Sequence, residues 1–302
     1  MRQLIVNADD FGYTRGVNRA ILEACRKGVV TSTSLLANGD AFEDAVESAI
    51  SEPGLDIGCH LNFIEGKPIS PPEGIPHLID RDGQFLRAGQ LAVRLTLGGV
   101  PESEIEREAG AQIEKLLRAG VRVSHVDTHK HTHTHPVVAR AVARAAQRCG
   151  IGWIRRPFEN FHPGSAGKVS AKRLLVGALN LLGPSFERRM GAMGLAMPDY
   201  FTGIVVTGRL TRAEFAAALA SLPEGTTEVM CHPGYCDPDL KKASTRLQRE
   251  RELERETVSD ETWRAVLRER GIRLTSFGEL SSRKDSVAKD TWPAIAEPAL
   301  RD

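Results

Sequence analysis

Residues 4–12 of the chain read Leu4-Ile5-Val6-Asn7-Ala8-Asp9-Asp10-Phe11-Gly12. The apolar run over residues 4–8 stops at two aspartates, which predicts a short buried strand that ends in a polar loop. Residues 17–27 follow with helical periodicity, and Gly28 stops that helix. A strand, a polar loop and a helix in this order form the repeating unit of a parallel α/β fold.

The same alternation continues along the rest of the chain. Further strands are predicted at residues 31–36, 55–63, 121–126, 151–154, 204–207, 227–231 and 274–276. Helices are predicted at residues 42–50, 102–119, 136–149, 211–222, 246–253 and 259–270, and over most of 168–197. At least seven strand–helix units fit this order. The fold class is therefore predicted to be α/β, as a distorted (β/α) barrel, with an open doubly wound sheet as the alternative.

One domain is expected to hold nearly the whole chain. Barrels of the (β/α) type use about 200–250 residues or more in a single domain, so a length of 302 residues fits one barrel. We assign residues 1–282 to that domain. Residues 283–302 are polar, contain two prolines and are expected to form a loosely attached tail. Residues 64–100, which are rich in glycine and proline, follow no clear pattern, and together with residues 158–200 they are expected to hold the loops that set substrate specificity.

Charge and composition argue against several classes of partner. The chain carries 40 basic and 39 acidic residues, a net charge of +1, and has no long basic run. Neither nucleic acid nor an anionic membrane surface is therefore expected as a partner, whereas a small neutral carbohydrate is compatible with this balance. No secretory signal or membrane-spanning segment is visible, and the five cysteines are widely spaced. These features favour a cytoplasmic protein without a disulfide framework.

Polar clusters that could carry chemistry follow several of the predicted strands. They are Asp9-Asp10, His60, the run from His125 to His135, and His232. In a (β/α) barrel the carboxyl ends of the strands form the active-site face, so these clusters are expected to meet. Singly, each has an ordinary explanation as a turn, a helix cap or a hydrogen-bonded structural histidine.

The histidine run is the strongest of these signals. Residues 125–135 hold five of the nine histidines and read His125-Val126-Asp127-Thr128-His129-Lys130-His131-Thr132-His133-Thr134-His135. If the strand continues through the run, His125, Asp127, His129, His131 and His133 share one face. A catalytic metal ion takes few protein ligands, so the others are expected to be neighbouring contacts, substrate contacts or helix caps. A solvated histidine-rich loop is the alternative.

One carboxylate and two histidines form a site that suits a divalent metal ion with open positions. Such an ion supports hydrolysis, because it makes water more acidic and polarises a carbonyl oxygen. Of the adjacent Asp9 and Asp10, one can bind metal while the other stays free as a base, because neighbours in an extended chain point in different directions. His232 fits a general acid. The sequence has no nucleotide-binding glycine motif and no G-x-S-x-G nucleophile motif.

These motifs together are similar to the YdjC-type carbohydrate deacetylases, a family that includes the chitooligosaccharide deacetylases. Four motifs carry the resemblance: Ile5-Val6-Asn7-Ala8-Asp9-Asp10-Phe11-Gly12, Gly58-Cys59-His60-Leu61, His125-Val126-Asp127-Thr128-His129-Lys130-His131 and Met230-Cys231-His232-Pro233-Gly234. The resemblance runs from about residue 4 to residue 280, and it also covers residues 30–34 and 245–251. It implies a distorted (β/α) barrel, one divalent metal ion and removal of acetyl groups from GlcNAc-containing sugars.

The resemblance also implies roles for individual positions. By position, the metal ligands match Asp10, His60 and His129. The catalytic base matches Asp9, and the proposed acid matches His232. Substrate or outer contacts are expected at His125, Asp127, His131 and either Arg155 or Arg156.

The metal and its surroundings are less fixed by the resemblance. Family members usually bind Mg²⁺, although two histidines and one carboxylate would suit Zn²⁺ at least as well. Lys130 departs from the Asp-Ser-His-His-His pattern of some members, which leaves His129 as a ligand but alters what lies behind it.

Three other functions stay open. The same chemistry could act on a glycolipid such as a GlcNAc-hopanoid, with the apolar residues 174–182 lining the site, although a core helix explains that stretch more simply. Another metal-dependent amidohydrolase or a phosphoesterase is the second alternative. A non-catalytic metal-binding or sugar-binding protein is the third. Barrels of this class often form homodimers, so a homodimer is one expected assembly.

Overall fold

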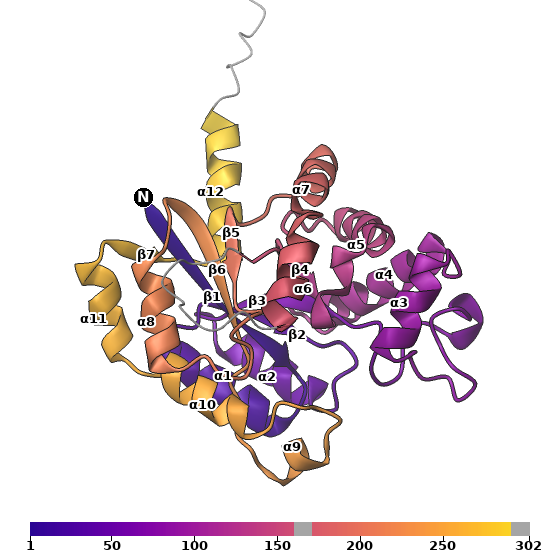
Figure 1. Cartoon of the computed structure of the whole chain (residues 1–302), viewed down its shortest axis with the longest axis horizontal. Coiled ribbons are helices and arrows are strands. Elements are labelled where there is room, and N and C mark those ends of the chain that lie inside the picture. The colour runs from indigo at the N-terminus through magenta and orange to yellow at the C-terminus, as the bar shows by residue number, and fades with distance from the viewer. Residues whose placement is uncertain (160–170, 291–302) are drawn as a thin grey trace, which may run out of the picture.

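The computed structural model describes residues 1–159 and 171–290 of the chain. Its strands are β1 (Arg2–Phe11), β2 (Ser32–Leu35), β3 (Asp56–Leu61), β4 (Val123–Thr128), β5 (Tyr200–Thr202), β6 (Gly225–Cys231) and β7 (Ile272–Leu274). These strands form one parallel sheet in the order β4-β3-β2-β1-β6-β5, and β7 pairs with the start of β1. Figure 1 shows that this sheet curls and that helices pack around it.

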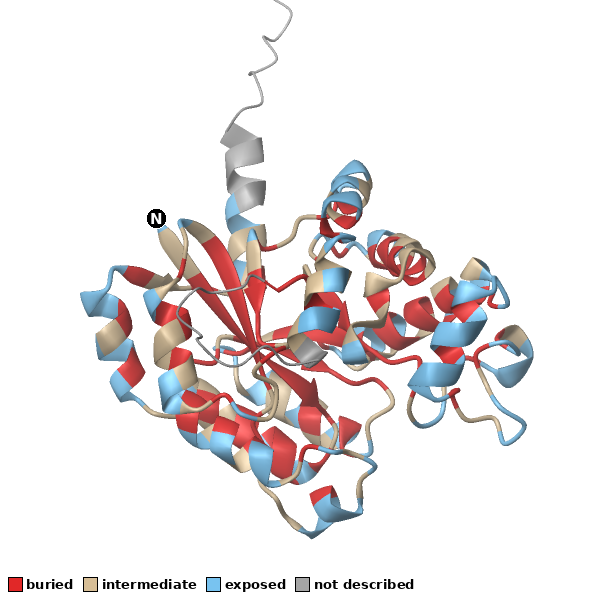
Figure 2. Cartoon of the chain, viewed as in Figure 1, coloured by how far each residue is buried: buried red, intermediate tan, exposed pale blue. Residues whose placement is uncertain are grey.

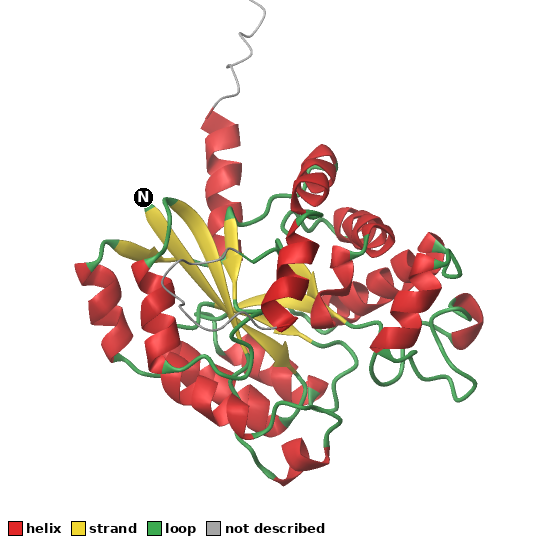
Figure 3. Ribbon diagram, in the orientation of Figure 1, coloured by secondary structure: helices red, strands yellow, loops and turns green. Residues whose placement is uncertain are grey.

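Helices connect the strands, as the alternating pattern predicts (Figure 3). They are α1 (Arg15–Arg26), α2 (Phe42–Ser51), α3 (Ala88–Thr96), α4 (Glu102–Arg118), α5 (Pro136–Arg148), α6 (Ala171–Asn180), α7 (Gly183–Ala192), α8 (Arg212–Ala220), α9 (Pro238–Lys242), α10 (Arg249–Val258), α11 (Thr262–Glu269) and α12 (Phe277–Asp290). Two 3-10 helices are η1 (Pro72–Gly74) and η2 (His129–Thr134). Local sequence sets several helix starts: the hydroxyl of Thr14 caps α1, and that of Thr211 caps α8.

Irregular backbone spans the gap between the edge strands β4 and β5. Val126 of β4 forms an isolated parallel bridge with Ile154, and Phe201 of β5 forms one with Glu159. The curled sheet with this bridging segment is a distorted (β/α) barrel in one domain, which confirms the predicted fold class. The strand predicted at residues 151–154 is present only as these bridging residues.

The strand predicted at residues 204–207 is wrong, because these residues form turns and β5 lies just before them. Their apolar, β-branched composition favours a strand, but their backbone groups are satisfied differently. The carboxylate of Glu159 accepts hydrogen bonds from the backbone N–H groups of Gly203 (3.3 Å) and Val205 (2.7 Å). A carboxylate therefore takes the place that a neighbouring strand would fill.

Strand alternation separates the packing residues from the polar ones. On β1, Leu4, Val6 and Ala8 belong to the hydrophobic core between sheet and helices. Asn7 and Asp9 point to the other side, where they hydrogen-bond to each other inside the barrel. Figure 2 shows the strands almost entirely buried, so the polar interior is enclosed by protein.

Three further expectations from the sequence can be compared with the structure. The expected boundary between residues 282 and 283 falls inside α12, and residues 291–302 lie outside the described part of the chain. Leu174, Leu175 and Leu181 are exposed, so the expectation that residues 174–182 pack as a core helix is wrong. Among the described residues, no helix is long and apolar enough to cross a membrane.

Candidate active site

A bulge in β1 brings two adjacent carboxylates to one pocket. The register of β1 against β2 shifts between Ala8 and Phe11, and Asp10 has a positive φ of 72°. Regular strand neighbours point to opposite faces, so this irregularity allows both Asp9 and Asp10 to line the pocket. The strand predicted to end at Ala8 therefore continues to Phe11, through the aspartates.

The pocket lies at the carboxyl ends of the strands and has a volume of about 380 Å³. It is lined by Asp9, Asp10, Tyr13, His60, Glu65, His129, Lys130, His131, Ile204, Thr207, Met230, His232, Ser244, Thr245, Arg246, Leu247 and Arg251. Six of the residues predicted from the sequence therefore meet at one place: Asp9, Asp10, His60, His129, His131 and His232.

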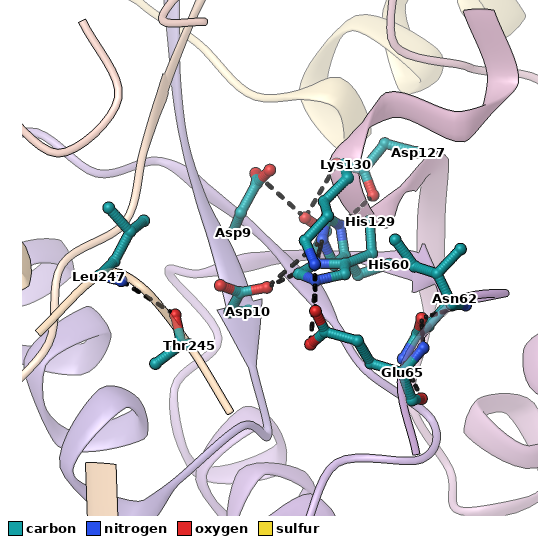
Figure 4. A network of polar contacts seen from close by, with 12 residues as sticks. Asp9, Asp10, His60, Asn62, Glu65, Asp127, His129, Lys130, Thr245 and Leu247 are labelled. Carbon is teal, nitrogen blue, oxygen red and sulfur yellow. Dashed lines mark hydrogen bonds and ion pairs between the residues drawn. The ribbon is translucent and has the colours of Figure 1, made fainter. Parts of the chain in front are cut away.

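Three of these side chains point their donor atoms at one another (Figure 4). His60 Nε2 lies 3.5 Å from Asp10 Oδ1, His129 Nδ1 lies 3.2 Å from the same oxygen, and the two nitrogens are 3.2 Å apart. Asp10 Oδ1 is buried, yet it accepts no hydrogen bond from the described residues. A buried acceptor without a donor is costly, and a cation at this point would satisfy it. The residues present therefore fit a divalent metal ion held by Asp10, His60 and His129.

Each of the three donors has an outer partner on its far side. Arg251 Nη2 donates to Asp10 Oδ2 at 2.5 Å, and His60 Nδ1 donates to Asp127 Oδ1 at 2.7 Å. His129 Nε2 lies 3.4 Å from Glu65 Oε2. Outer partners of this kind fix the tautomer and orientation of metal ligands. The pattern leaves the inner atoms of all three side chains free to face an ion.

The electrostatics of the site favour positive charge. Burial alone would lower the pKa values of the His60 and His129 rings, but the nearby carboxylates outweigh the effect of burial. Asp10 and Glu65 raise the pKa of His129 to about 9, and Asp127 raises the pKa of His60. Without a metal ion, His129 is therefore protonated at neutral pH.

Metal binding is expected to release protons. A histidine must be neutral to act as a ligand, so an ion displaces at least the proton on His129 below the pKa of about 9. The apparent metal affinity should rise about tenfold per pH unit between pH 6 and 8. Calorimetric titration with Zn²⁺ at pH 7, in two buffers of different protonation enthalpy, measures the number of protons released. A value near zero would contradict the charge state described above.

A buried arginine holds Asp9. Arg155 donates to Asp9 Oδ2 from Nη1 and to Asp9 Oδ1 from Nη2, both at 2.7 Å. The same guanidinium contacts Asp127 at 2.7 Å and Glu228 at 2.7 Å. Burial would raise the pKa of Asp9, but the Arg155 charge outweighs it and lowers that pKa. Asp9 is therefore ionised and oriented beside the three metal-facing atoms.

His232 approaches the same pocket from the end of β6. Its backbone N–H donates to Glu254 Oε2 at 2.6 Å, which fixes the start of the turn. Its Nδ1 is buried and makes no hydrogen bond with the described residues. Burial lowers the pKa of His232 to about 4, so the ring is neutral at neutral pH.

The strand pattern predicts that the histidines of residues 125–133 share one face, but the structure shows that they do not. β4 ends at Thr128, and Lys130 and His131 then adopt left-handed backbone, with φ of 51° and 53°. This turn separates the histidines that alternation would align. His133 hydrogen-bonds to the Thr128 hydroxyl at 2.5 Å, and His135 caps α5.

His125 is also placed differently from the prediction. It lies inside the barrel, stacked on Phe277 with ring centroids 3.8 Å apart, and does not line the pocket. Its Nδ1 pairs with the Ser124 hydroxyl at 2.9 Å. A side chain at Gly58 would overlap its ring, with a Cβ only 2.3 Å from a ring carbon. His125 therefore fills the barrel interior rather than contacting substrate.

The remaining predicted residues either support the residues of the site from behind, line the pocket, or lie away from it. Asp127 lies behind His60, and Arg155 lies behind Asp9. Neither arginine lines the pocket, but Arg155 contacts the pocket residue Asp9, whereas Arg156 pairs with Glu187 of α7 at 2.7 Å. His131 lines the pocket with its ring edge-on to Phe201.

Sequence reasoning missed several residues that support the site. Glu65 lies in the stretch that follows no clear pattern, and Glu228 lies inside an apolar strand segment. Arg251 is the last residue of the segment 245–251 that the family resemblance covers. That resemblance is the only feature of the sequence that points to Arg251. Partners of this kind depend on contacts between distant segments, and the spacing of residues along one strand does not report them.

Comparison with known proteins places the chain among named relatives. The profile of the YdjC-like protein family matches residues 3–269. A carbohydrate deacetylase of Geobacillus stearothermophilus is 34% identical over 279 residues, which cover 92% of this chain and 98% of that protein. A carbohydrate deacetylase of Listeria monocytogenes serotype 4a is 34% identical over 278 residues, covering 92% and 100%.

A solved structure extends the comparison to the fold. The crystal structure of a putative cellobiose-phosphate cleavage protein from Enterococcus faecalis superposes with a TM-score of 0.69 at 28% identity, covering 92% of this chain and 98% of that one. The family profile and both curated relatives extend across nearly the whole barrel and through the segments that build the pocket. The chain therefore belongs to the YdjC-like protein family.

Proposed function

We propose that this chain is a metal-dependent hydrolase that removes the acetyl group from N-acetylated amino sugars, such as GlcNAc-containing oligosaccharides or glycoconjugates. The relatives named carbohydrate deacetylase support the reaction class. The observation that carries the proposal is the joint placement of an ionised carboxylate and a histidine beside three inward-facing metal donors.

The metal site consists of Asp10, His60 and His129. An ion held there supplies Lewis acidity, which makes a neighbouring water more acidic and polarises the acetyl carbonyl. Arg251 keeps Asp10 in position from behind, and Asp127 does the same for His60. Mg²⁺ is the ion that the family resemblance implies, whereas two imidazole ligands favour Zn²⁺.

Asp9 acts as the general base. The Arg155 guanidinium keeps it ionised, so it accepts the proton that water loses as the water oxygen bonds to the acetyl carbon. The amide C–N bond then breaks, and His232 delivers a proton to the amine nitrogen. Because burial lowers the pKa of His232 to about 4, the ring is neutral before the reaction. It takes the proton that Asp9 accepted from water and passes it to the amine nitrogen as the C–N bond breaks. The products are acetate and the free amino sugar.

The other predicted residues of the site have different roles, and we assign substrate binding to His131. His131 lines the pocket, and its buried Nδ1 makes no hydrogen bond within the described part of the chain. Asp127 and Arg155 act through His60 and Asp9, which they hold. Leu174 and Leu175 of α6 are exposed and are not among the described residues that line the pocket, so they give no support to a glycolipid acceptor. Five free cysteines are typical of a reducing compartment, and we therefore propose that the protein acts in the cytoplasm. We propose a homodimer as its assembly.

Acetate release from a substrate panel tests this function. The panel contains GlcNAc, diacetylchitobiose, longer chitooligosaccharides and a GlcNAc lipid, each assayed with added Mg²⁺ or Zn²⁺. We expect acetate release from at least one soluble sugar. Release from the lipid alone would identify the glycolipid alternative. Stoichiometric metal binding without release from any of them would favour another amide or ester substrate, or a binding protein.

A further inference from the structure

The outer partners of the three metal donors, Asp127, Arg251 and Glu65, differ in how deeply they are buried. Asp127 and Arg251 are buried, with 0% and 2% of their surface exposed. Glu65 follows β3 in a surface segment, and 25% of its side chain is exposed. His129 is therefore supported from a loop, whereas Asp10 and His60 are supported from buried side chains.

Glu65 lies on the side of His129 that faces away from the other two donors. His129 Nδ1 is 3.2 Å from both Asp10 Oδ1 and His60 Nε2, while its Nε2 is 3.4 Å from Glu65 Oε2 (Figure 4). A neutral imidazole carries its proton on one nitrogen and binds metal through the other. A carboxylate beside Nε2 keeps the proton there and leaves Nδ1 free for the ion.

The loop that carries Glu65 is held rigidly by Asn62. The side-chain oxygen of Asn62 accepts hydrogen bonds from the backbone N–H groups of Ile64 (3.0 Å) and Glu65 (3.2 Å), and its amide donates to the Glu65 carbonyl (2.8 Å). The backbone of Asn62 is in turn paired with Gln112 of α4 through two hydrogen bonds, of 2.9 and 2.6 Å. Glu65 is therefore fixed to the barrel although it lies at its surface.

Lys130 holds the second oxygen of Glu65. Its ammonium donates to Glu65 Oε1, while Oε2 faces His129. The left-handed backbone at Lys130, with φ of 51°, follows directly after the ligand His129. Both oxygens of Glu65 are thus used by two consecutive residues of η2. Lys130 is also one of the two positions, with Thr128, at which this chain departs from the Asp-Ser-His-His-His pattern of some members.

We propose that Glu65 is a positioning residue for the metal ligand His129, and that Lys130 holds Glu65 in place. This inference rests on the proposed function, because it requires that Asp10, His60 and His129 bind an ion. It assigns a role to the unclassified loop after β3 and to the lysine that replaces a histidine of the family pattern. Glu65 acts through His129 and does not itself touch the reacting atoms.

The affinity of the full-length protein for Zn²⁺ tests the proposal, measured by competition with a chromophoric chelator. Glu65→Gln keeps the shape of the side chain but removes its charge, and it should weaken Zn²⁺ binding about 10- to 100-fold. Glu73→Gln is the matched control, because Glu73 is an exposed carboxylate on η1 that does not line the pocket. The control should bind Zn²⁺ as the wild type does.

Two further readouts separate positioning from other roles. At saturating Zn²⁺, both kcat and KM of Glu65→Gln should return to within a few-fold of the wild type. A disrupted fold would keep kcat low, and a lost substrate contact would keep KM high. Lys130→Met should weaken Zn²⁺ binding less than Glu65→Gln does, and it supplies the test if Glu65→Gln does not fold.

Several results would overturn the proposal. Unchanged Zn²⁺ affinity in Glu65→Gln, or a loss of kcat that excess metal does not restore, would show that Glu65 does not position His129. Unchanged affinity in Lys130→Met would remove Lys130 from the arrangement. Failure of the wild type to bind Zn²⁺ would instead contradict the metal site of the proposed function. Normal metal binding without acetate release would contradict that function alone.

Discussion

Asp9→Asn is expected to lower kcat for acetate release by about 10²- to 10⁴-fold, the usual contribution of a general base. Asparagine has nearly the same shape, so it can still accept a hydrogen bond from Arg155, but it cannot take the proton from water. Metal binding should be retained, because Asp9 is not one of the three inward-facing donors. Steady-state kinetics and a metal-binding titration on the same preparation measure both effects.

The neighbouring residue provides the matched comparison. Asp10→Asn is the same substitution one residue along the bulge, yet it should reduce metal affinity as well as kcat, because Asp10 Oδ1 faces both imidazoles. The two variants should therefore differ in metal content although they change the same chemical group. If Asp9→Asn kept a near-full rate, Asp9 would not be the base.

His129→Ala is expected to weaken metal binding by more than about 100-fold, since loss of an outer partner alone costs 10- to 100-fold. Acetate release at micromolar metal should fall to background. The reason is direct: Nδ1 of His129 lies 3.2 Å from each of the other two donors, and alanine leaves that side of the site open.

His135→Ala is the control for this prediction. His135 belongs to the same histidine run, but it caps α5 and does not line the pocket. It should lose some thermal stability and keep wild-type metal affinity, measured by the same chelator competition. A His129→Ala protein that bound the ion as tightly as His135→Ala would show that the ligand set is wrong.

The sequence allowed much of the barrel to be predicted, because long apolar runs with clear helix and turn signals mark most of its elements. β1, β3 and α4 lie within a few residues of their expected positions. One predicted strand is wrong because a side chain satisfies the backbone there. Residues 204–207 are apolar and β-branched, yet Glu159 binds their backbone, and a carboxylate from a distant segment leaves no local trace.

The residues of the candidate site could also be predicted in part. Asp9, Asp10, His60, His129 and His232 meet in one pocket because the carboxyl ends of parallel strands converge. The alignment of the histidine run was wrong, because two left-handed residues after β4 break the strand periodicity, and neither is a glycine that would announce the turn.

The outer contacts of the site could be predicted only in part. Asp127 and Arg155 could be named as neighbours, but not which atom each holds. Glu65 reaches His129 from a loop more than sixty positions earlier in the chain. Such pairs are decided by tertiary packing and not by spacing.

The central claim, that one ion at Asp10, His60 and His129 makes this protein a deacetylase, is tested most directly by restoring metal to the metal-free protein. The apoprotein, prepared with a chelator, is titrated with Zn²⁺ or Mg²⁺ while bound metal and acetate release from diacetylchitobiose are followed together. We expect no release without metal and a rate that saturates as one ion binds per chain. Acetate release by the metal-free protein, or a rate that does not follow metal occupancy, would contradict the account.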